Sequence, residues 1–317
     1  MRRLEWVVII GFGPAALLLV AALAYVHFDT ETESITEEVR RTAGGSFVRL
    51  PDGMVHYELA GPPEARAVVL VHGFSVPYYI WDPTFAALVH SGFRVLRYDL
   101  YGRGYSDRPN VAYDADLYDR QLLGLLSALS IPGPVDLVGL SMGGPIVVTF
   151  ADRHPERVRA LVLLDSSYHE ARRPPVWLGA PLFGKYYGEY YMTVLVSPSL
   201  AEGQLADFFQ PERFPDWPEK YRVQMQYKGF RRALLSTMRD YMGRDVRGEF
   251  ERVGQSGRPV LLLWGEADQT VPLPVSDEIR RAIPQAEFHL IQEAGHLPHY
   301  ERPEVVNPIL VGFLKKQ

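Results

Sequence analysis

One serine of this chain lies between closely spaced glycines, in the segment Gly139-Leu140-Ser141-Met142-Gly143. The mainly apolar residues 135–138 before it are typical of a buried strand, and residues 145–151 after it are typical of a helix with proline in its first turn. A sharp strand-to-helix turn holds a serine in a strained backbone conformation and exposes its hydroxyl, and glycines avoid the clashes that Cβ atoms would cause there. We therefore predict that Ser141 is the nucleophile of an acyl-transfer reaction.

A serine hydroxyl is a weak nucleophile unless a base takes its proton and a third group orients that base. In enzymes with this kind of turn, an acid and then a histidine follow the serine along the chain. Asp268 follows the apolar run 260–264, and His296 follows the strand-like residues 287–291. We therefore predict Asp268 as the acid and His296 as the base.

Three neighbouring residues compete for these two roles. His299 lies close to His296, but it falls at a predicted helix entry rather than in the loop just beyond a strand. Asp165 closes another predicted strand and ranks second to Asp268 as the acid. Glu266 reads as a solvated loop charge.

The developing oxyanion of acyl transfer needs rigid hydrogen-bond donors, which are usually backbone N–H groups. His72-Gly73-Phe74 follows the buried run 68–71, so we predict the N–H of Phe74 as the first donor. The N–H of Met142, directly after the nucleophile at a helix N-terminus, is the predicted second donor.

Strand-like runs alternate with helical segments along most of the chain, and a hairpin joined through Asp52-Gly53 precedes them. These runs are residues 68–71, 93–98, 135–140, 160–164, 260–264 and 287–291. The alternation predicts an α/β fold with a mostly parallel sheet and helices on both faces. Ligands bind beyond the carboxyl ends of such strands, which is where the predicted site residues fall.

Several of these segments resemble motifs of the α/β-hydrolase superfamily, and the resemblance runs from about Ser46 to the C-terminus. They are His72-Gly73-Phe74, residues 99–106, residues 139–144, residues 265–268 and Gly295-His296. The Ser-Met-Gly-Gly turn is most similar to that of membrane-anchored monoacylglycerol lipases and of the carbon-carbon bond hydrolases of aromatic degradation. The resemblance implies an α/β-hydrolase fold with a Ser-Asp-His triad. Epoxide hydrolases and haloalkane dehalogenases carry aspartate at the nucleophile position, so Ser141 argues against both.

The interval 168–244 interrupts the alternation and contains no predicted strand, so we predict a helical cap inserted into a core of residues 46–167 and 245–317. Its central part is rich in aromatic residues, some of which must form the cap's own core. We expect others to line an acyl pocket, with Tyr190, Tyr191 and Phe209 as the candidate substrate-binding residues. The arginines of this interval and just beyond it are expected on a solvated helical face: Arg231, Arg232, Arg239, Arg244 and Arg247.

The N-terminal residues 6–28 contain no acidic residue, lysine or arginine, and Arg2 and Arg3 precede them. A run of this length spans a bilayer, so we predict a membrane anchor over residues 1–30 and a charged linker over residues 31–45. The preceding arginines favour an inside N-terminus and an extracytoplasmic catalytic domain, whereas Arg40 and Arg41 close beyond the run favour the opposite orientation, so the sequence leaves the side of the membrane open. Cleavage as a signal peptide, which would give a secreted protein, is the alternative.

Composition narrows the function further. The 317 residues carry a net charge of −5 and form no basic face, so we expect no nucleic-acid partner. There is no cysteine, which excludes disulfides and a thiolate nucleophile, and no sequence pattern indicates a metal or another cofactor. The sequence leaves the oligomeric state open.

These observations predict a membrane-anchored serine hydrolase that cleaves carboxylic esters through an acyl-enzyme on Ser141. Monoacylglycerols or similar lipid esters are the expected substrates. Two alternatives stay open: a carbon-carbon bond hydrolase of vinylogous diketones, and a ligand-binding module without catalysis on a hydrolase scaffold. The intact set of Ser141, Asp268 and His296 counts against the second.

Overall fold

A computed structural model describes residues 2–168 and 187–317, with the side chains of the first helix described from Ala15 onward. Eight strands form one sheet: β1 Ser46–Leu50, β2 Gly53–Ala60, β3 Ala67–Val71, β4 Arg94–Tyr98, β5 Val135–Leu140, β6 Val158–Leu164, β7 Val260–Gly265 and β8 Glu287–Ile291. Their order across the sheet is β1-β2-β4-β3-β5-β6-β7-β8. The hairpin and all six later strands predicted from the sequence are therefore present.

The first two strands differ in direction from the rest. β1 pairs antiparallel with β2, and β2 pairs antiparallel with β4, whereas every later pairing is parallel. Because parallel strands point the same way, the loops after β3, β5, β7 and β8 all leave at the same edge of the sheet. This edge brings together the segments that carry the predicted site residues.

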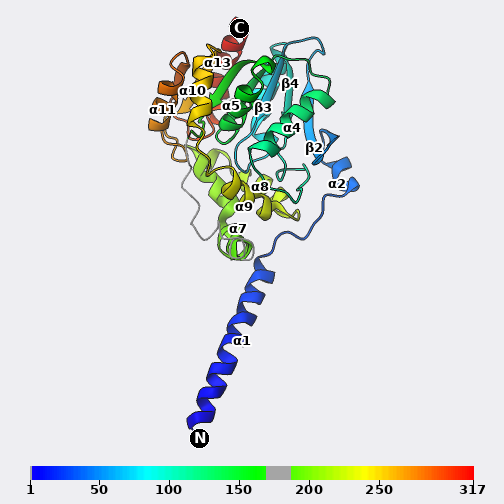
Figure 1. The fold of residues 1–317 in the computed structure, drawn as a ribbon, viewed down its shortest axis with the longest axis vertical. Coiled ribbons are helices and arrows are strands. Elements are labelled where there is room, and N and C mark those ends of the chain that lie inside the picture. The colour runs from blue at the N-terminus through cyan, green and yellow to red at the C-terminus, as the bar shows by residue number, and fades with distance from the viewer. Residues whose placement is uncertain (1, 169–186) are drawn as a thin grey trace.

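Both faces of the sheet are buried, as expected for parallel strands with near-continuous apolar runs. Side chains alternate between two apolar cores: Val69 and Val71 of β3 belong to one, and Val68 and Leu70 to the other. The first core also contains residues of α4 Ala115–Ala128, α5 Gly143–Arg153, α10 Arg247–Gln255 and α11 Pro274–Ala282. The second contains residues of α3 Asp82–His90 and α13 Pro303–Lys316, and Tyr300 of α12 Pro298–Glu301 packs against it. Figure 1 shows this layered arrangement.

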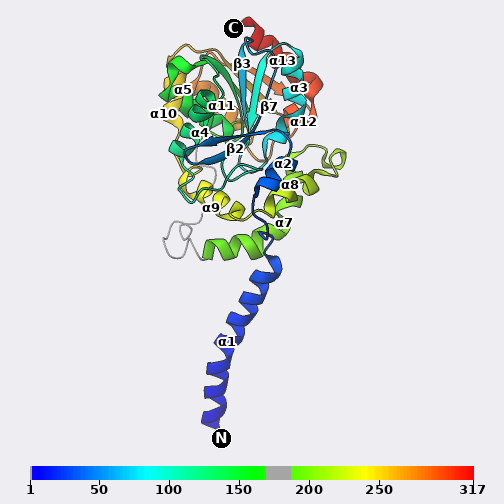
Figure 2. The same cartoon turned by 90° about the vertical axis from the view of Figure 1, so that its right-hand side faces the viewer.

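Helical segments form most of the described part of the interval between β6 and β7, where Tyr227 makes an isolated bridge with Glu33. After a short helical segment at 187–191 come η4 Met192–Val196, α7 Ser197–Gly203, η5 Gln204–Asp207, η6 Pro211–Arg213, α8 Trp217–Met225 and α9 Phe230–Asp240. Figures 1 and 2 show α7, α8 and α9 between the sheet and the N-terminal helix. Residues 169–186 of the predicted cap lie outside the described part of the chain.

The N-terminal helix α1, Arg2–Phe28, projects away from the rest of the molecule in both views. In the part of the chain whose residues are described, no helix combines the length and the hydropathy that a membrane crossing requires. A short helix, α2 Glu37–Thr42, follows in the predicted linker.

One cap arginine departs from its prediction. The residue Arg231 is only 2% exposed and its guanidinium donates to Asp29 at 2.6 Å, so it does not lie on a solvated face. The charge pattern of α9 could not reveal this, because the partner lies more than two hundred residues away in the sequence, directly after α1.

Candidate active site

The turn at the predicted nucleophile has the backbone strain that its sequence implies. Ser141 has φ +53°, a left-handed conformation that non-glycine residues rarely adopt. A Cβ atom at Gly139 would lie 2.4 Å from the carbonyl oxygen of Gly143, so glycine is required there. The strand β5 therefore turns directly into α5 with Ser141 at the tip, as the sequence predicts.

The start of α5 packs closely against the end of a neighbouring strand. A Cβ atom at Gly143 would lie 2.3 Å from the carbonyl oxygen of Val71, the last residue of β3. The N–H of Met142 belongs to the first turn of this helix, where the helix dipole favours negative charge. The close contact also places the loop after β3 beside the turn, because a Cβ atom at Gly73 would lie 3.2 Å from Cβ of Ser141.

The buried ring of His72 holds the predicted oxyanion loop. Its Nε2 accepts from the N–H of Leu100 at 2.9 Å, so the remaining nitrogen, Nδ1, donates to the carbonyl of Gly73 at 2.9 Å. Burial lowers the pKa of His72 to about 4, which keeps the ring neutral and this tautomer fixed. The peptide that receives the bond also carries the N–H of Phe74, so the predicted donor is held in one orientation.

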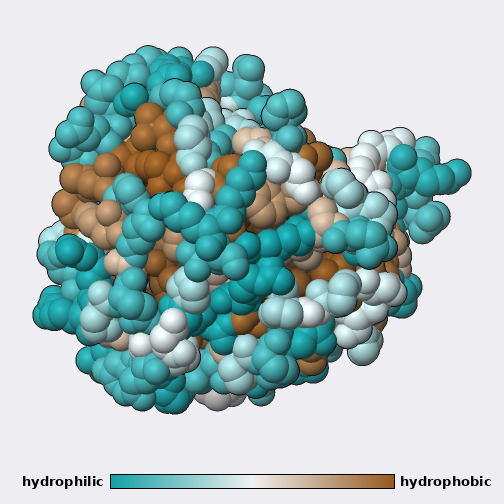
Figure 3. Space-filling view, turned by 90° about the horizontal axis from the view of Figure 1, so that it is seen from above, coloured by the Kyte–Doolittle hydropathy of each residue, from teal (hydrophilic) through white to brown (hydrophobic). Residues whose placement is uncertain are grey.

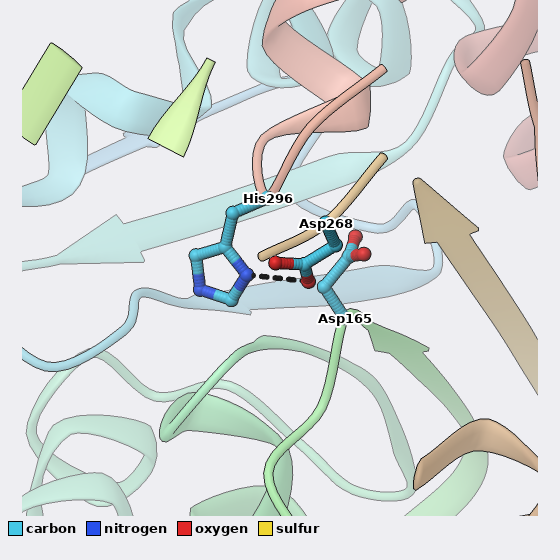
Figure 4. A group of neighbouring side chains, drawn as sticks. All are labelled: Asp165, Asp268 and His296. Atoms are coloured by element: carbon cyan, nitrogen blue, oxygen red, sulfur yellow. Dashed lines mark hydrogen bonds and ion pairs between the residues drawn. The ribbon is translucent and has the colours of Figure 1, made fainter. Parts of the chain in front are cut away.

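His296 and Asp268 form a buried pair. Nδ1 of His296 lies 2.8 Å from Oδ2 of Asp268, as Figure 4 shows. Oδ1 of Asp268 accepts from the N–H groups of Thr270 and Val271 at 2.8 and 2.9 Å. These bonds fix the carboxylate, which in turn fixes the ring. Within the described residues, no hydrogen bond joins His296 to Ser141.

The charge of Asp268 controls the titration of His296. Burial by itself lowers the pKa of the ring, but the negative charge and hydrogen bond of Asp268, with a further contribution from Asp207, outweigh it. The net result is a raised pKa. The ring is therefore a stronger base than an ordinary histidine.

Asp165 lies beside this pair but forms no hydrogen bond with the His296 ring. It is fully buried, has φ +42°, and accepts from the N–H of Gly265 at 2.8 Å, while its Oδ2 has no hydrogen-bond partner. Burial, followed by the charge of Asp268, raises its pKa well above the ordinary range. Figure 4 shows Asp165 on the side of Asp268 away from the His296 ring.

Carboxylate oxygens of Asp165 and Asp268 and a ring nitrogen of His296 lie within 4.8 Å of one another, a donor set that resembles a metal site. Hydrogen bonds already occupy both oxygens of Asp268 and the Nδ1 of His296. We therefore interpret the cluster as an acid-base pair with a second buried carboxyl beside it.

The other two competitors lie elsewhere. His299 is fully buried and its Nε2 donates to the carbonyl of Ile80 at 3.0 Å, and burial lowers its pKa to about 3. Glu266 is exposed in the loop after β7. In the described part of the chain, neither forms a hydrogen bond or ion pair with the side chain of Asp268 or of His296.

Sequence reasoning missed the contribution of Glu301. This carboxylate is 2% exposed and accepts from the N–H of Gly295 and of Phe209, both at 2.6 Å. The adjacent N–H of His296 donates to the carbonyl of Asp207 at 2.7 Å. The loop that carries the histidine is therefore bonded directly to the cap, and no motif in the sequence indicates this contact.

The three candidate substrate-binding residues differ in their surroundings. The ring of Tyr190 stacks on Tyr25 of α1 with the centroids 6.3 Å apart. Tyr191 is half-buried against the second apolar core. Phe209 is 43% exposed, close to the loop of His296.

Comparison with known proteins identifies a family that has this fold. The sequence profile of the alpha/beta hydrolase fold matches residues 66–303, and the chain belongs to that family. It is 29% identical over 295 residues to the 2-hydroxy-6-oxononadienedioate/2-hydroxy-6-oxononatrienedioate hydrolase of Paraburkholderia xenovorans, covering 87% of this chain and 97% of that protein.

Two solved structures are similar over most of the chain. The enol-lactonase from Burkholderia xenovorans LB400 has a TM-score of 0.72 and 25% identity, covering 85% of this chain and 100% of that one. A thermophilic esterase from Thermogutta terrifontis has a TM-score of 0.72 and 25% identity, covering 86% and 99%. The chain is therefore an α/β hydrolase.

Proposed function

We propose that this α/β hydrolase cleaves carboxylic esters through a covalent acyl-enzyme on Ser141. The observation that carries the proposal is the strained serine at the tip of β5, at the same sheet edge as the buried Asp268–His296 pair. Nucleophile, base and orienting acid are the parts that acyl transfer from an ester needs. The similarity to the esterase supports the same reaction class.

Each residue of the proposed site has its own role in the reaction. Oγ of Ser141 attacks the ester carbonyl while Nε2 of His296 takes its proton, and the carboxylate of Asp268 stabilises the imidazolium that forms. The N–H groups of Phe74 and Met142 bind the oxyanion. When the tetrahedral intermediate collapses, His296 returns the proton to the leaving alcohol, and water then hydrolyses the acyl-enzyme by the same steps. Catalytic hydrogen bonds often shorten only when substrate binds, so Ser141 and His296 need not be bonded beforehand.

Monoacylglycerols or similar lipid esters are the proposed substrates, supported by the aromatic composition of the cap. A buried methylene contributes about 0.8 kcal/mol, so four additional methylenes held in the transition state raise kcat/KM about two-hundredfold at most. We expect monoacyl esters of medium chain length to outperform acetyl esters in a panel of graded chain length. A flat profile, or fastest turnover of acetyl esters, would contradict the lipid proposal while leaving the Ser141 mechanism intact.

Single substitutions in the cap refine this test. Phe209→Ala should narrow the gap between medium-chain and acetyl esters, because Phe209 is partly exposed next to the loop of His296. Trp217→Phe is the matched control, since Trp217 is 2% exposed and packs edge-on against Phe208. The control should lower thermal stability and affect all chain lengths alike.

A second candidate reaction is carbon-carbon bond hydrolysis of a vinylogous diketone. It is favoured by the 29% identity to a hydrolase named for an oxo-dienedioate, and the same serine could serve both reactions. Steady-state turnover of such a diketone beside a medium-chain ester distinguishes them. Faster turnover of the diketone than of the ester would identify carbon-carbon bond hydrolysis as the main activity.

We further propose that α1 anchors the enzyme in a membrane, with the catalytic domain on the extracytoplasmic side. The uncharged residues 6–28 support this, as do the exposed apolar side chains of the projecting helix: Leu17, Leu18, Leu19, Val20, Leu23 and Val26, each at least 60% exposed. On the opposite end of the molecule, hydrophilic residues separate the apolar areas (Figure 3). The full-length protein should sediment with membranes and resist extraction with alkaline carbonate. A mature N-terminus near Tyr25 would instead establish a cleaved, secreted form.

A further inference from the structure

A buried arginine with no counter-ion lies next to the predicted oxyanion loop. Arg103 follows β4 and is 0% exposed. Its Nε donates to the carbonyl of Phe74 at 2.7 Å, and its Nη1 donates to Tyr101 and Tyr118 at 3.2 and 3.1 Å. Its Nη2 is buried and has no hydrogen-bond partner. Among the residues that the structure describes, no carboxylate forms an ion pair with it.

Asp99, whose charge acts on His72 together with that of Arg103, already bonds to other groups. Oδ1 of Asp99 accepts from the N–H of Tyr78 at 2.8 Å, and its Oδ2 accepts from Nδ1 of His56 at 2.7 Å and the N–H of Tyr105 at 2.9 Å. An arginine stays charged in proteins, and burying an unpaired charge is costly unless another state of the site uses it. The positive charge of Arg103 is therefore uncompensated beside the loop where negative charge would develop.

The guanidinium of Arg103 makes two contacts with Phe74. Besides the hydrogen bond to the carbonyl, its Cζ lies 5.5 Å from the centroid of the Phe74 ring. The preceding peptide is held by His72 through the carbonyl of Gly73. Both peptide groups that flank the Cα of Phe74 are thus fixed by side chains, one of them charged.

We propose that Arg103 is a positioning residue for the oxyanion. Its guanidinium holds Phe74 in the orientation in which its N–H binds the oxyanion, and its uncompensated positive charge stabilises the negative charge of the tetrahedral intermediate bound there. The inference rests on the proposed acyl transfer at Ser141. For unit charges roughly 8 Å apart at an effective dielectric constant of about 20, loss of the arginine charge destabilises the transition state enough to lower the rate about 30-fold. Removing a direct oxyanion donor costs about 10²- to 10³-fold, so a smaller effect is expected from one residue further away.

A pair of inhibitors separates this role from a structural one. Pentylboronic acid forms an anionic tetrahedral adduct with a serine, whereas hexanamide is a neutral ground-state analogue of the same chain length. In Arg103→Met we expect about 30-fold weaker binding of the boronic acid, less than threefold weaker binding of hexanamide, and an about 30-fold lower kcat on a hexanoyl ester at unchanged KM. Arg103→Lys, which keeps a buried cation, should restore boronic acid affinity to within about threefold of the unmodified enzyme.

Two controls make the outcome decisive. Tyr118→Phe removes one hydrogen bond to the same guanidinium but leaves its charge, and should not change the ratio of the two affinities. If Arg103→Met fails to fold, Arg103→Gln compared with Arg103→Lys makes the same test of charge. Equal weakening of both inhibitors, or of neither, would overturn the proposal. Failure of the acyl-transfer mechanism would look different, because the boronic acid would then bind equally well to the unmodified enzyme and to Ser141→Ala.

Discussion

The segment before α2 should contribute measurably to the stability of the cap. Asp29 accepts from Nη2 of Arg231 at 2.6 Å, and the carboxylate of Glu31 accepts from the N–H groups of Gly229 and Arg231, both at 2.6 Å. Gly229 begins the first turn of α9 and has no side chain to cap it, so Glu31 supplies the cap from a distant segment. A protein that begins at Asp29 keeps these contacts, and one that begins at Thr32 loses them while it keeps the backbone hydrogen bonds of Glu33 to Gln226 and Lys228.

The size of the effect follows from the burial of the guanidinium. Arg231 is 2% exposed, so removal of its acidic partners leaves a charge without compensation, which costs about 3–5 kcal/mol. Asp29 is 32% exposed at its side chain, so Glu31, at 8%, should account for the larger share. In a domain of this size, about 2 °C of Tm per kcal/mol gives an expected fall of about 6–10 °C.

Thermal unfolding of four proteins tests this reasoning: the two starting points, each with and without Arg231→Met. The truncation should lower Tm by about 6–10 °C with Arg231 present and by less than half as much in Arg231→Met, because no buried cation is then stranded. An equal loss of Tm in both backgrounds would contradict the charge argument. Activity on a short ester, measured well below Tm, checks that each protein is folded.

Two further predictions concern the acid-base residues. Asp268→Asn should lower kcat by about 10⁴-fold, because the orientation and tautomer of His296 depend on its carboxylate. Asp165→Asn should change kcat by less than about tenfold, since Asp165 bonds to the N–H of Gly265 and forms no hydrogen bond with His296; the reverse order in ester assays would reassign the acid. His296 must be neutral to act as the base, so kcat/KM should rise with pH through a midpoint above 6.5, the ordinary histidine value, in agreement with its raised pKa. A midpoint below 6 in the pH profile would contradict the pairing with Asp268.

Local signals in the sequence predict the strands and the turn at Ser141 well. The apolar runs that predict β3, β5, β6 and β7 are buried on both faces, and few other structures accommodate them. The glycines around Ser141 are needed because backbone atoms of the same turn and of β3 come too close for a side chain. Each of these requirements acts over a few residues, so the sequence displays it.

Contacts between distant segments could not be predicted in this way. Glu31 and Arg231 carry charges that usually indicate solvent, yet packing of the linker on the cap buries both. Arg103 lies between two glycines in the sequence, and only the folded structure shows that its guanidinium donates to the carbonyl of Phe74. The raised pKa of Asp165 likewise depends on burial and on the charge of Asp268, which a different strand brings beside it.

The central claim is that Ser141 becomes covalently acylated during ester hydrolysis. The most direct measurement is the intact mass of the protein, quenched with acid within its first turnovers of a medium-chain ester, followed by peptide mapping. The account predicts an added mass equal to the acyl group, located on Ser141 and lost on further incubation, and no added mass in Ser141→Ala. Turnover of the ester by Ser141→Ala at a near-normal rate, or acylation at another residue, would contradict the mechanism.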